Sequence, residues 1–161
     1  MSALQVPAVQ SIDAATGTPV NRMIVAVLAL IGVLISAYTL MYHLGLIGSM
    51  LCGTGGCETV QNSPWARFLG VPVPLLGLGG YGALLVTAML GIQPRFIADR
   101  RISIVLLAAA LIGFAFSAYL SYLEAFVIHA WCRWCIASAA LTVLLLLAAL
   151  PEIARMRGSR T

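Results

Sequence analysis

The stretch Trp131-Cys-Arg-Trp-Cys135-Ile-Ala-Ser-Ala-Ala140 places a cysteine pair at the start of the last apolar run of the chain, 135–150. Residues three apart share one face of a helix, so thiols at Cys132 and Cys135 can come within disulfide distance. At a helix N-terminus, the free N–H groups and the helix dipole stabilise a thiolate. The stretch therefore predicts a membrane helix that begins near Trp131 and carries a reactive dithiol.

Three further apolar runs precede this one, at 23–42, 72–92 and 102–123. The chain is 61% hydrophobic and only 9% charged, whereas soluble domains carry about 25% charged residues. A bilayer core of about 30 Å requires about 17–25 helical residues, and the runs lack the two-residue alternation of barrel strands. The sequence therefore predicts an all-α membrane protein, a bundle of four transmembrane helices.

The arginines indicate how this bundle lies in the membrane. The chain has nine basic residues, all arginine, with a net charge of +4. Seven are expected on one side of the membrane, Arg22, Arg95, Arg100, Arg101, Arg155, Arg157 and Arg160, against Arg67 and Arg133 on the other. This bias predicts cytoplasmic termini and four extracytoplasmic cysteines, in a compartment where disulfides persist. A nucleic-acid-binding protein would instead gather these charges on a soluble face.

Three regions follow from this topology. Residues 1–21 are expected to form a flexible cytoplasmic tail, and 151–161 a basic one. Between them, 22–150 form the membrane domain. The first apolar run is too long for a signal-peptide core, so it is interpreted as a retained helix.

The second cysteine pair, Cys52 and Cys57, lies in the long extracytoplasmic loop 43–71. Glycines between the two make the segment mobile, and closure of so small a ring adds little stability. Both features favour thiol exchange over a structural staple. Of the three pairings that four cysteines allow, we expect a resting disulfide within each pair and a transient bridge between Cys52 and Cys132.

The rest of this loop predicts a short interfacial cap helix at 63–69. Ser63 and Pro64 form a helix-start signal, and Gly70 provides a stop. Trp65, Phe68 and Leu69 would form its apolar side, over the outer mouth of the bundle. An ordinary amphipathic membrane anchor is the alternative.

Small residues inside the apolar runs predict close helix packing. Gly32 and Ser36 form one such pair, and Gly113, Ser117 and Ser121 repeat at four-residue spacing. In lipid, small residues let helix backbones approach each other. Among the polar residues, Glu124 is interpreted as interfacial, and the two histidines, His43 and His129, as solvated or capping residues.

Two non-redox interpretations stay open at this point. Four thiolates fit the count of a structural zinc site, but an oxidising compartment favours disulfides over metal ligands. The cysteines can also staple a subunit of a channel or transporter. No file of Asp, Glu or Lys crosses the apolar runs, which weakens an ion-path function.

The order of these elements resembles the vitamin K epoxide reductase family, in particular its bacterial homologues. The resemblance covers nearly all of 22–150. It rests on a helix, the loop pair, Ser63-x-Trp65 with Gly70, a Gly-rich second helix, a third helix, and Cys132-x-x-Cys135 at the fourth. The unrelated DsbB-type quinone reductase, the nearest enzyme rival, has its two cysteine pairs in the opposite order.

The resemblance implies a four-helix bundle around a quinone, menaquinone or ubiquinone, in the bacterial inner membrane. Cys135 would lie next to the quinone, and Cys132 would accept attack from Cys52. Cys57 would exchange with a separate thioredoxin-like or DsbA-like protein. Ser63 and Trp65 would support the cap and the quinone region. The implied activity is a quinone-dependent thiol–disulfide oxidoreductase that supports disulfide formation in exported proteins, with no metal.

Overall fold

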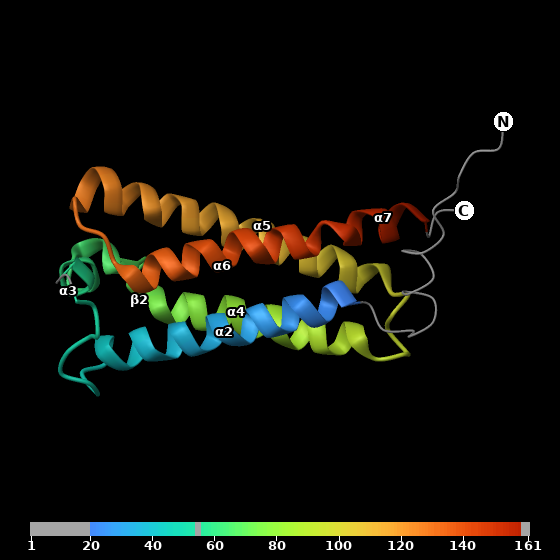
Figure 1. The fold of residues 1–161 in the computed structure, drawn as a ribbon, viewed down its shortest axis with the longest axis horizontal. Helices are drawn as coiled ribbons and strands as arrows, with labels where there is room; N and C mark the ends of the chain where they lie inside the picture. Colours follow the sequence, from blue (N-terminus) through green and yellow to red (C-terminus); the bar gives the residue numbers. More distant parts are fainter. Residues whose placement is uncertain (1–19, 54–55, 159–161) are drawn as a thin grey trace.

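The bundle is built from four long helices. A computed structural model describes residues 20–53 and 56–158. Within these residues, four helices are long and apolar enough to cross a membrane, which confirms the predicted fold class. They are α2 (Val20–His43), α4 (Val73–Ile92), α5 (Arg100–Leu123) and α6 (Arg133–Ala149). Figure 1 shows them side by side, with the short helix α7 (Pro151–Gly158) continuing the line of α6. Except for its last two residues, the tail predicted over 1–21 lies outside the described residues.

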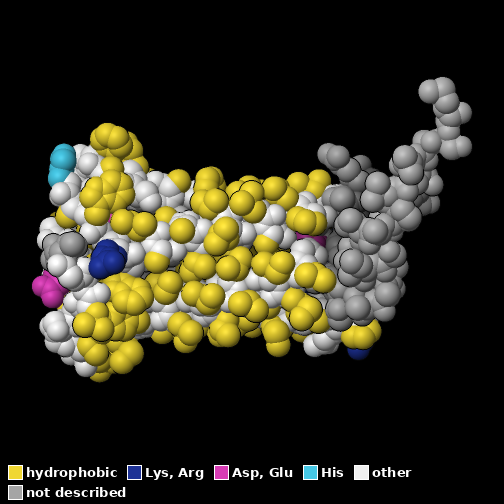
Figure 2. All heavy atoms as spheres, viewed as in Figure 1, with side chains coloured by type: hydrophobic (Ala, Val, Ile, Leu, Met, Phe, Trp, Pro, Cys, Tyr) yellow, Lys and Arg dark blue, Asp and Glu magenta, His cyan; other side chains and the backbone are white. Residues whose placement is uncertain are grey.

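Hydrophobic side chains cover the long faces of this bundle. Figure 2 shows them along its middle, with the visible charged side chains near the two ends. Leu34, Val86, Ile112 and Leu147 are each more than half exposed. Apolar surface of this extent suits contact with lipid.

Small residues determine how α2 and α4 pack. A side chain on Gly32 would overlap the ring of Tyr81, and one on Gly77 would lie 2.8 Å from Ser36 Oγ. The two helices therefore touch along a line where bulkier residues would separate them. This confirms the packing expected of Gly32 and Ser36.

The loop between α2 and α4 forms a cap at one end of the bundle, and its structure differs from the predicted helix at 63–69. Ser63 precedes a 3₁₀ turn with Pro64 at its first position, as expected. Beyond this turn the prediction is wrong, because Leu69 (φ 51°) and Gly70 (φ 85°) reverse the chain. Two successive residues with positive φ are typical of a tight hairpin. The elements of the cap are α3 (Gly56–Gln61), η1 (Pro64–Ala66), β1 (Arg67–Phe68) and β2 (Val71–Pro72).

A buried ion pair closes the opposite end of the bundle. Arg22 Nη2 lies 2.8 Å from Glu152 Oε2, and the two side chains are 1% and 0% exposed. Arg22 also donates to the carbonyl oxygen of Gly91 at 2.7 Å, and Ser103 Oγ donates to Glu152 Oε2 at 2.5 Å. The arginine that marks a membrane boundary in the sequence thus joins α2 and α4 to α5 and α7.

Replacing Arg22 with alanine should destabilise the bundle strongly. The change removes the charged partner of the buried Glu152 carboxylate and leaves it with the neutral donors Asn21 and Ser103, and the loss of one member of a buried ion pair typically costs about 3–5 kcal/mol. Denaturant unfolding of the detergent-solubilised protein measures the difference. Arg101→Ala, at an exposed arginine in the first turn of α5, is the matched control. Equal unfolding midpoints for the two variants would contradict the assigned role of the pair.

Candidate redox site

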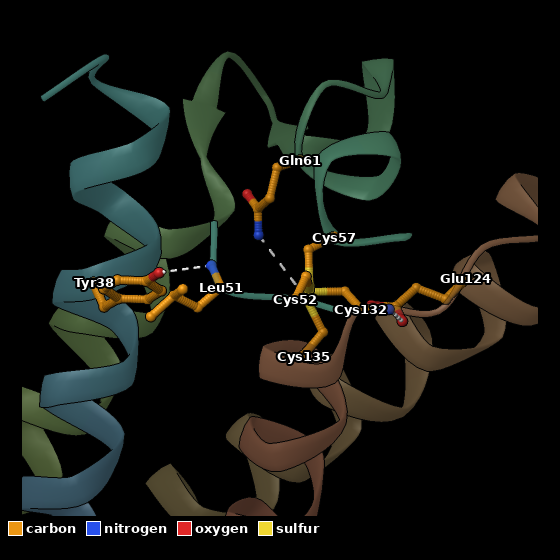
Figure 3. Close-up of a disulfide and its surroundings, with 8 residues drawn as sticks. All are labelled: Tyr38, Leu51, Cys52, Cys57, Gln61, Glu124, Cys132 and Cys135. Carbon is orange, nitrogen blue, oxygen red and sulfur yellow. Dashed lines mark hydrogen bonds between the residues drawn. A yellow bond between two sulfur atoms is a disulfide. The ribbon is translucent and has the colours of Figure 1, made fainter. Parts of the chain in front are cut away.

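All four cysteines meet at the capped end of the bundle. Cys52, Cys57 and Cys132 belong to one buried cluster, with exposures of 3%, 0% and 0%, and Cys135 packs against it. Figure 3 shows the loop pair directly beside the start of α6. The predicted meeting of the two pairs at one end of the fold is therefore confirmed.

The two pairs differ in oxidation state. Cys52 and Cys57 form a disulfide with a Cα–Cα distance of 6.1 Å, as the sequence predicted. Cys132 and Cys135 are free thiols, so the resting disulfide expected between them is absent. The loop disulfide also removes two of the four thiolates that a zinc site would require.

The free pair has the environment of a reactive dithiol. Cys132 is the N-cap residue of α6, and Cys135 follows in the first turn. A hydrogen bond with the Cys135 thiol lowers the pKa of Cys132 below its ordinary value, against the opposing effect of burial. The N–H groups of Cys135 and Trp134 also favour the thiolate, whereas the charge of Glu124 opposes it. The sequence argument for a thiolate at a helix N-terminus agrees with this result.

Glu124 is a site residue that the sequence analysis missed. Its side chain is only 4% exposed, so it is buried inside the protein, which the interfacial interpretation did not predict. Its Oε2 accepts a hydrogen bond from the N–H of Cys132 at 3.1 Å. It begins the π-helical turn η2 (Glu124–Ile128), which extends α5 toward the cysteines. The overlooked signal was its position as the one acidic residue in 102–128, because an ionisable residue in a membrane span is commonly functional.

A cavity of about 500 Å³ extends from Cys135 into the bundle. All four long helices contribute to its mostly apolar wall, from Thr39 of α2 to Ser138 of α6. Gly113, Ser117 and Ser121 line it as well, and Gly113 faces open space. The expectation that this row packs against a helix is therefore wrong, because the small residues border the cavity.

Residues 23–150 match the vitamin K epoxide reductase family. The chain belongs to this family. The match includes the cap, both cysteine pairs and the residues that line the cavity. Membership identifies the protein as a membrane thiol–disulfide oxidoreductase and confirms the resemblance.

The cap of this vitamin K epoxide reductase family member reaches over both the thiols and the cavity. Gln61, the last residue of α3, lines the cavity, and its Nε2 lies 4.0 Å from Cys135 Sγ. At the other edge of the cap, the N–H of Leu51 donates to the Tyr38 hydroxyl at 3.0 Å. The Tyr38 ring in turn packs on Trp134, with centroids 4.8 Å apart. These contacts hold the loop disulfide against the start of α6.

Two residues assigned to the quinone by the resemblance lie elsewhere in the cap. Ser63 Oγ donates to the carbonyl oxygen of Val60 at 2.7 Å and borders an outer polar cleft of about 610 Å³. Trp65 is 46% exposed. Neither residue is part of the wall of the cavity at Cys135. Their role at the quinone stays a prediction.

Proposed function

We propose that this protein passes electrons from a thioredoxin-like or DsbA-like partner to a membrane quinone, and so supports disulfide formation in exported proteins. One observation carries the proposal. An oxidised loop pair, Cys52 and Cys57, lies against a reduced pair, Cys132 and Cys135, at the mouth of an apolar cavity between membrane helices. Two dithiol pairs in contact can exchange electrons, and the cavity has room for an acceptor beside Cys135.

The residues of the cavity fit a quinone. Its volume of about 500 Å³ lies within the range of small-molecule sites, about 300–1,000 Å³. The surface of the wall is mainly apolar, and Thr39, Gln61 and Ser138 are among the polar side chains that line it. A bound quinone supplies the acceptor for two electrons and two protons. The chain contributes Cys135 as the thiol that faces this acceptor.

The relay begins at the loop pair. A thiolate of the reduced partner attacks Cys57, which breaks the Cys52–Cys57 bond, and the partner's second thiol completes its disulfide. Cys52 then attacks Cys132 of an oxidised Cys132–Cys135 pair and releases Cys135. Finally, Cys57 attacks Cys52, which restores the loop disulfide and frees Cys132. Each step requires a thiolate attacker with access to the sulfur it attacks.

The oxidation state of the described structure matches one stage of this relay. After the internal exchange, the loop pair is oxidised and the pair on α6 is reduced, as found here. The two electrons then reside on Cys132 and Cys135, next to the cavity. Because Cys57 is fully buried, attack by the partner requires the cap to move away from α6.

The direction of the relay across the membrane follows from the arginines. Their bias supports a capped end outside the cytoplasm and both termini inside, and the membrane that we assign is a bacterial inner membrane. The outer location gives Cys57 access to an exported partner. It also keeps the relay in the compartment where disulfides form.

The direct test is anaerobic mixing of the purified protein with a reduced thioredoxin-like protein, while quinone absorbance is followed. We expect one quinone reduced for each partner dithiol oxidised. Partner oxidation without loss of quinone would exclude quinone as the acceptor. A variant with all four cysteines changed to serine separates the remaining alternative, because a merely stapled membrane subunit would lose stability and show no redox defect.

A leucine at position 113 should block the cavity selectively. The new side chain fills the open space beside Gly113, so we expect the KM for quinone to rise by about tenfold or more. Exchange between the two cysteine pairs should keep its rate, because Gly113 lies on α5 and is not part of the cluster in which the pairs meet. Gly79→Leu is the control, at an exposed glycine of α4 outside the cavity wall. An unchanged KM in the Gly113 variant would place the quinone elsewhere.

A further inference from the structure

Glu124 occupies an unusual position between the thiols and the cavity. Its carboxylate accepts the N–H of Cys132 at 3.1 Å. It also interacts electrostatically with the Cys135 thiol, which borders the same cavity. Its own carbonyl oxygen accepts the N–H groups of His129 and Ala130, which fixes the π-helical turn η2. The side chain also forms part of the cavity wall. One buried carboxyl thus bonds the start of the reactive pair and borders the cavity beside Cys135. Figure 3 shows it next to Cys132.

A capping role alone does not require an acid at this position. The N–H of Cys132 needs an oxygen acceptor, and a neutral glutamine side chain provides one. A carboxylate buried in a membrane protein costs considerably more than a neutral group. The acidic group therefore points to a function that the amide would lack, which is the uptake and release of a proton.

The oxidation of the pair generates the proton that needs such an acceptor. Cys132 ionises readily, because the Cys135 thiol donates a hydrogen bond to it. The proton of Cys135 must leave when the two sulfurs join. The titratable residues in the cavity wall are Tyr81, Glu124 and Cys135. The Tyr81 hydroxyl already bonds Ser138, at 2.7 Å from its Oγ, which leaves Glu124 as the base in contact with the thiol.

We propose that Glu124 is a catalytic residue, the base that takes the proton of the Cys135 thiol when the pair is oxidised. This inference rests on the proposed function. The Cys135 S–H bond breaks, its proton moves to the Glu124 carboxylate, and a bond forms between the sulfurs of Cys132 and Cys135. The two electrons released go to the acceptor, a quinone. Glu124 then gives up its proton as one of the two that quinone reduction consumes, and water provides the other.

Glu124→Gln tests the inference in full-length protein with Cys52 and Cys57 changed to alanine, so that only the reactive pair is titrated. Two quantities are measured across pH: the ultraviolet absorbance of the thiolate and the single-turnover rate of oxidation by a short-chain quinone. The negative charge of Glu124 opposes ionisation of Cys132, so the thiolate should form at lower pH in the variant. Its oxidation rate at neutral pH should nevertheless fall by about 10²-fold.

A base and a merely structural residue predict different results, because only loss of a base makes oxidation slower while the thiolate forms at lower pH. An oxidation rate that is unchanged, or that rises with the thiolate population, would overturn the proposal. Glu124→Asp keeps a carboxylate and should recover part of the rate, and it remains informative if the glutamine variant does not fold. Glu58→Gln, at an exposed carboxyl of α3, is the control and should leave both quantities unchanged.

A second oxidant distinguishes failure of this inference from failure of the proposed function. A small water-soluble disulfide also oxidises the pair, and the closing of the Cys132–Cys135 bond again requires the Cys135 proton to leave. If the parent protein does not react with quinone, the proposed function fails. Slower ring closure with the small disulfide in Glu124→Gln would then still support the base, and an equal closure rate would overturn it.

Discussion

Cys135→Ser is expected to reduce electron transfer to quinone to the uncatalysed background. The variant retains Cys132, so Cys52 can still form a bridge to it, but no thiol remains beside the cavity to complete the transfer. The bridge forms when the Cys132 thiolate attacks Cys52 of the loop disulfide and releases Cys57. The variant lacks one of the two thiols that can resolve this bridge, Cys135, and retains only Cys57, so a covalent Cys52–Cys132 species should accumulate. Quinone absorbance under anaerobic conditions measures the first effect, and non-reducing gels with peptide mapping measure the second.

Cys57→Ser is the informative comparison for this variant. It removes the sulfur that the partner attacks, so oxidation of the partner should stop. A chemically reduced Cys132–Cys135 pair should nevertheless pass electrons to quinone at its normal rate. Quinone turnover that survives in Cys135→Ser would show that the terminal thiol is assigned to the wrong residue.

Gly56→Ala should uncouple the two cysteine pairs. A Cβ at this first residue of α3 would overlap the carbonyl oxygen of Trp131, a backbone atom that cannot turn aside. The cap must therefore shift away from the start of α6. A misplacement of about 1 Å can reduce a reaction rate by about 10²-fold, and we expect a loss of this order in exchange between the pairs. Rapid acid quenching, alkylation and mass spectrometry report the rate.

Gly48→Ala controls for this substitution within the same loop. Its added Cβ would meet no atom within 4 Å, and its φ is not positive. Oxidation of a pre-reduced Cys132–Cys135 pair by quinone should be much less affected in both variants, because the four long helices supply most of the cavity wall. Normal exchange in Gly56→Ala would mean that the cap need not contact Trp131 for the relay.

The helices of this fold could be predicted because their signals are local. Apolar runs long enough for a bilayer became α2, α4, α5 and α6, and the cysteine pair at 132–135 marked the start of the last one. The hairpin of the cap was not predicted, because Gly70 was interpreted as a helix stop. Leu69 gave no local sign that it would take a positive φ, so the reversal of the chain was not apparent.

The contacts that could not be predicted join segments that are distant in the sequence. Glu124 was assigned to the membrane interface because its hydrogen-bond partner, Cys132, belongs to the next helix. The π-helical turn η2, which the sequence did not predict, directs the Glu124 side chain toward Cys132. Arg22 was interpreted as a topology signal for the same reason, since Glu152 lies 130 residues further along the chain. Charge patterns predicted the end of the bundle where each residue lies, but not its burial.

The near-complete burial of Cys52, Cys57 and Cys132 also insulates the relay. An exposed dithiol can be oxidised by exchange with any accessible disulfide, and secreted proteins contain many disulfides. With the cap closed, oxidised glutathione and misfolded chains cannot reach these three sulfurs. In the proposed relay, the electrons of the reduced pair then leave through Cys135 toward the cavity. The same burial that slows attack by the proposed partner thus limits the loss of electrons to other disulfides.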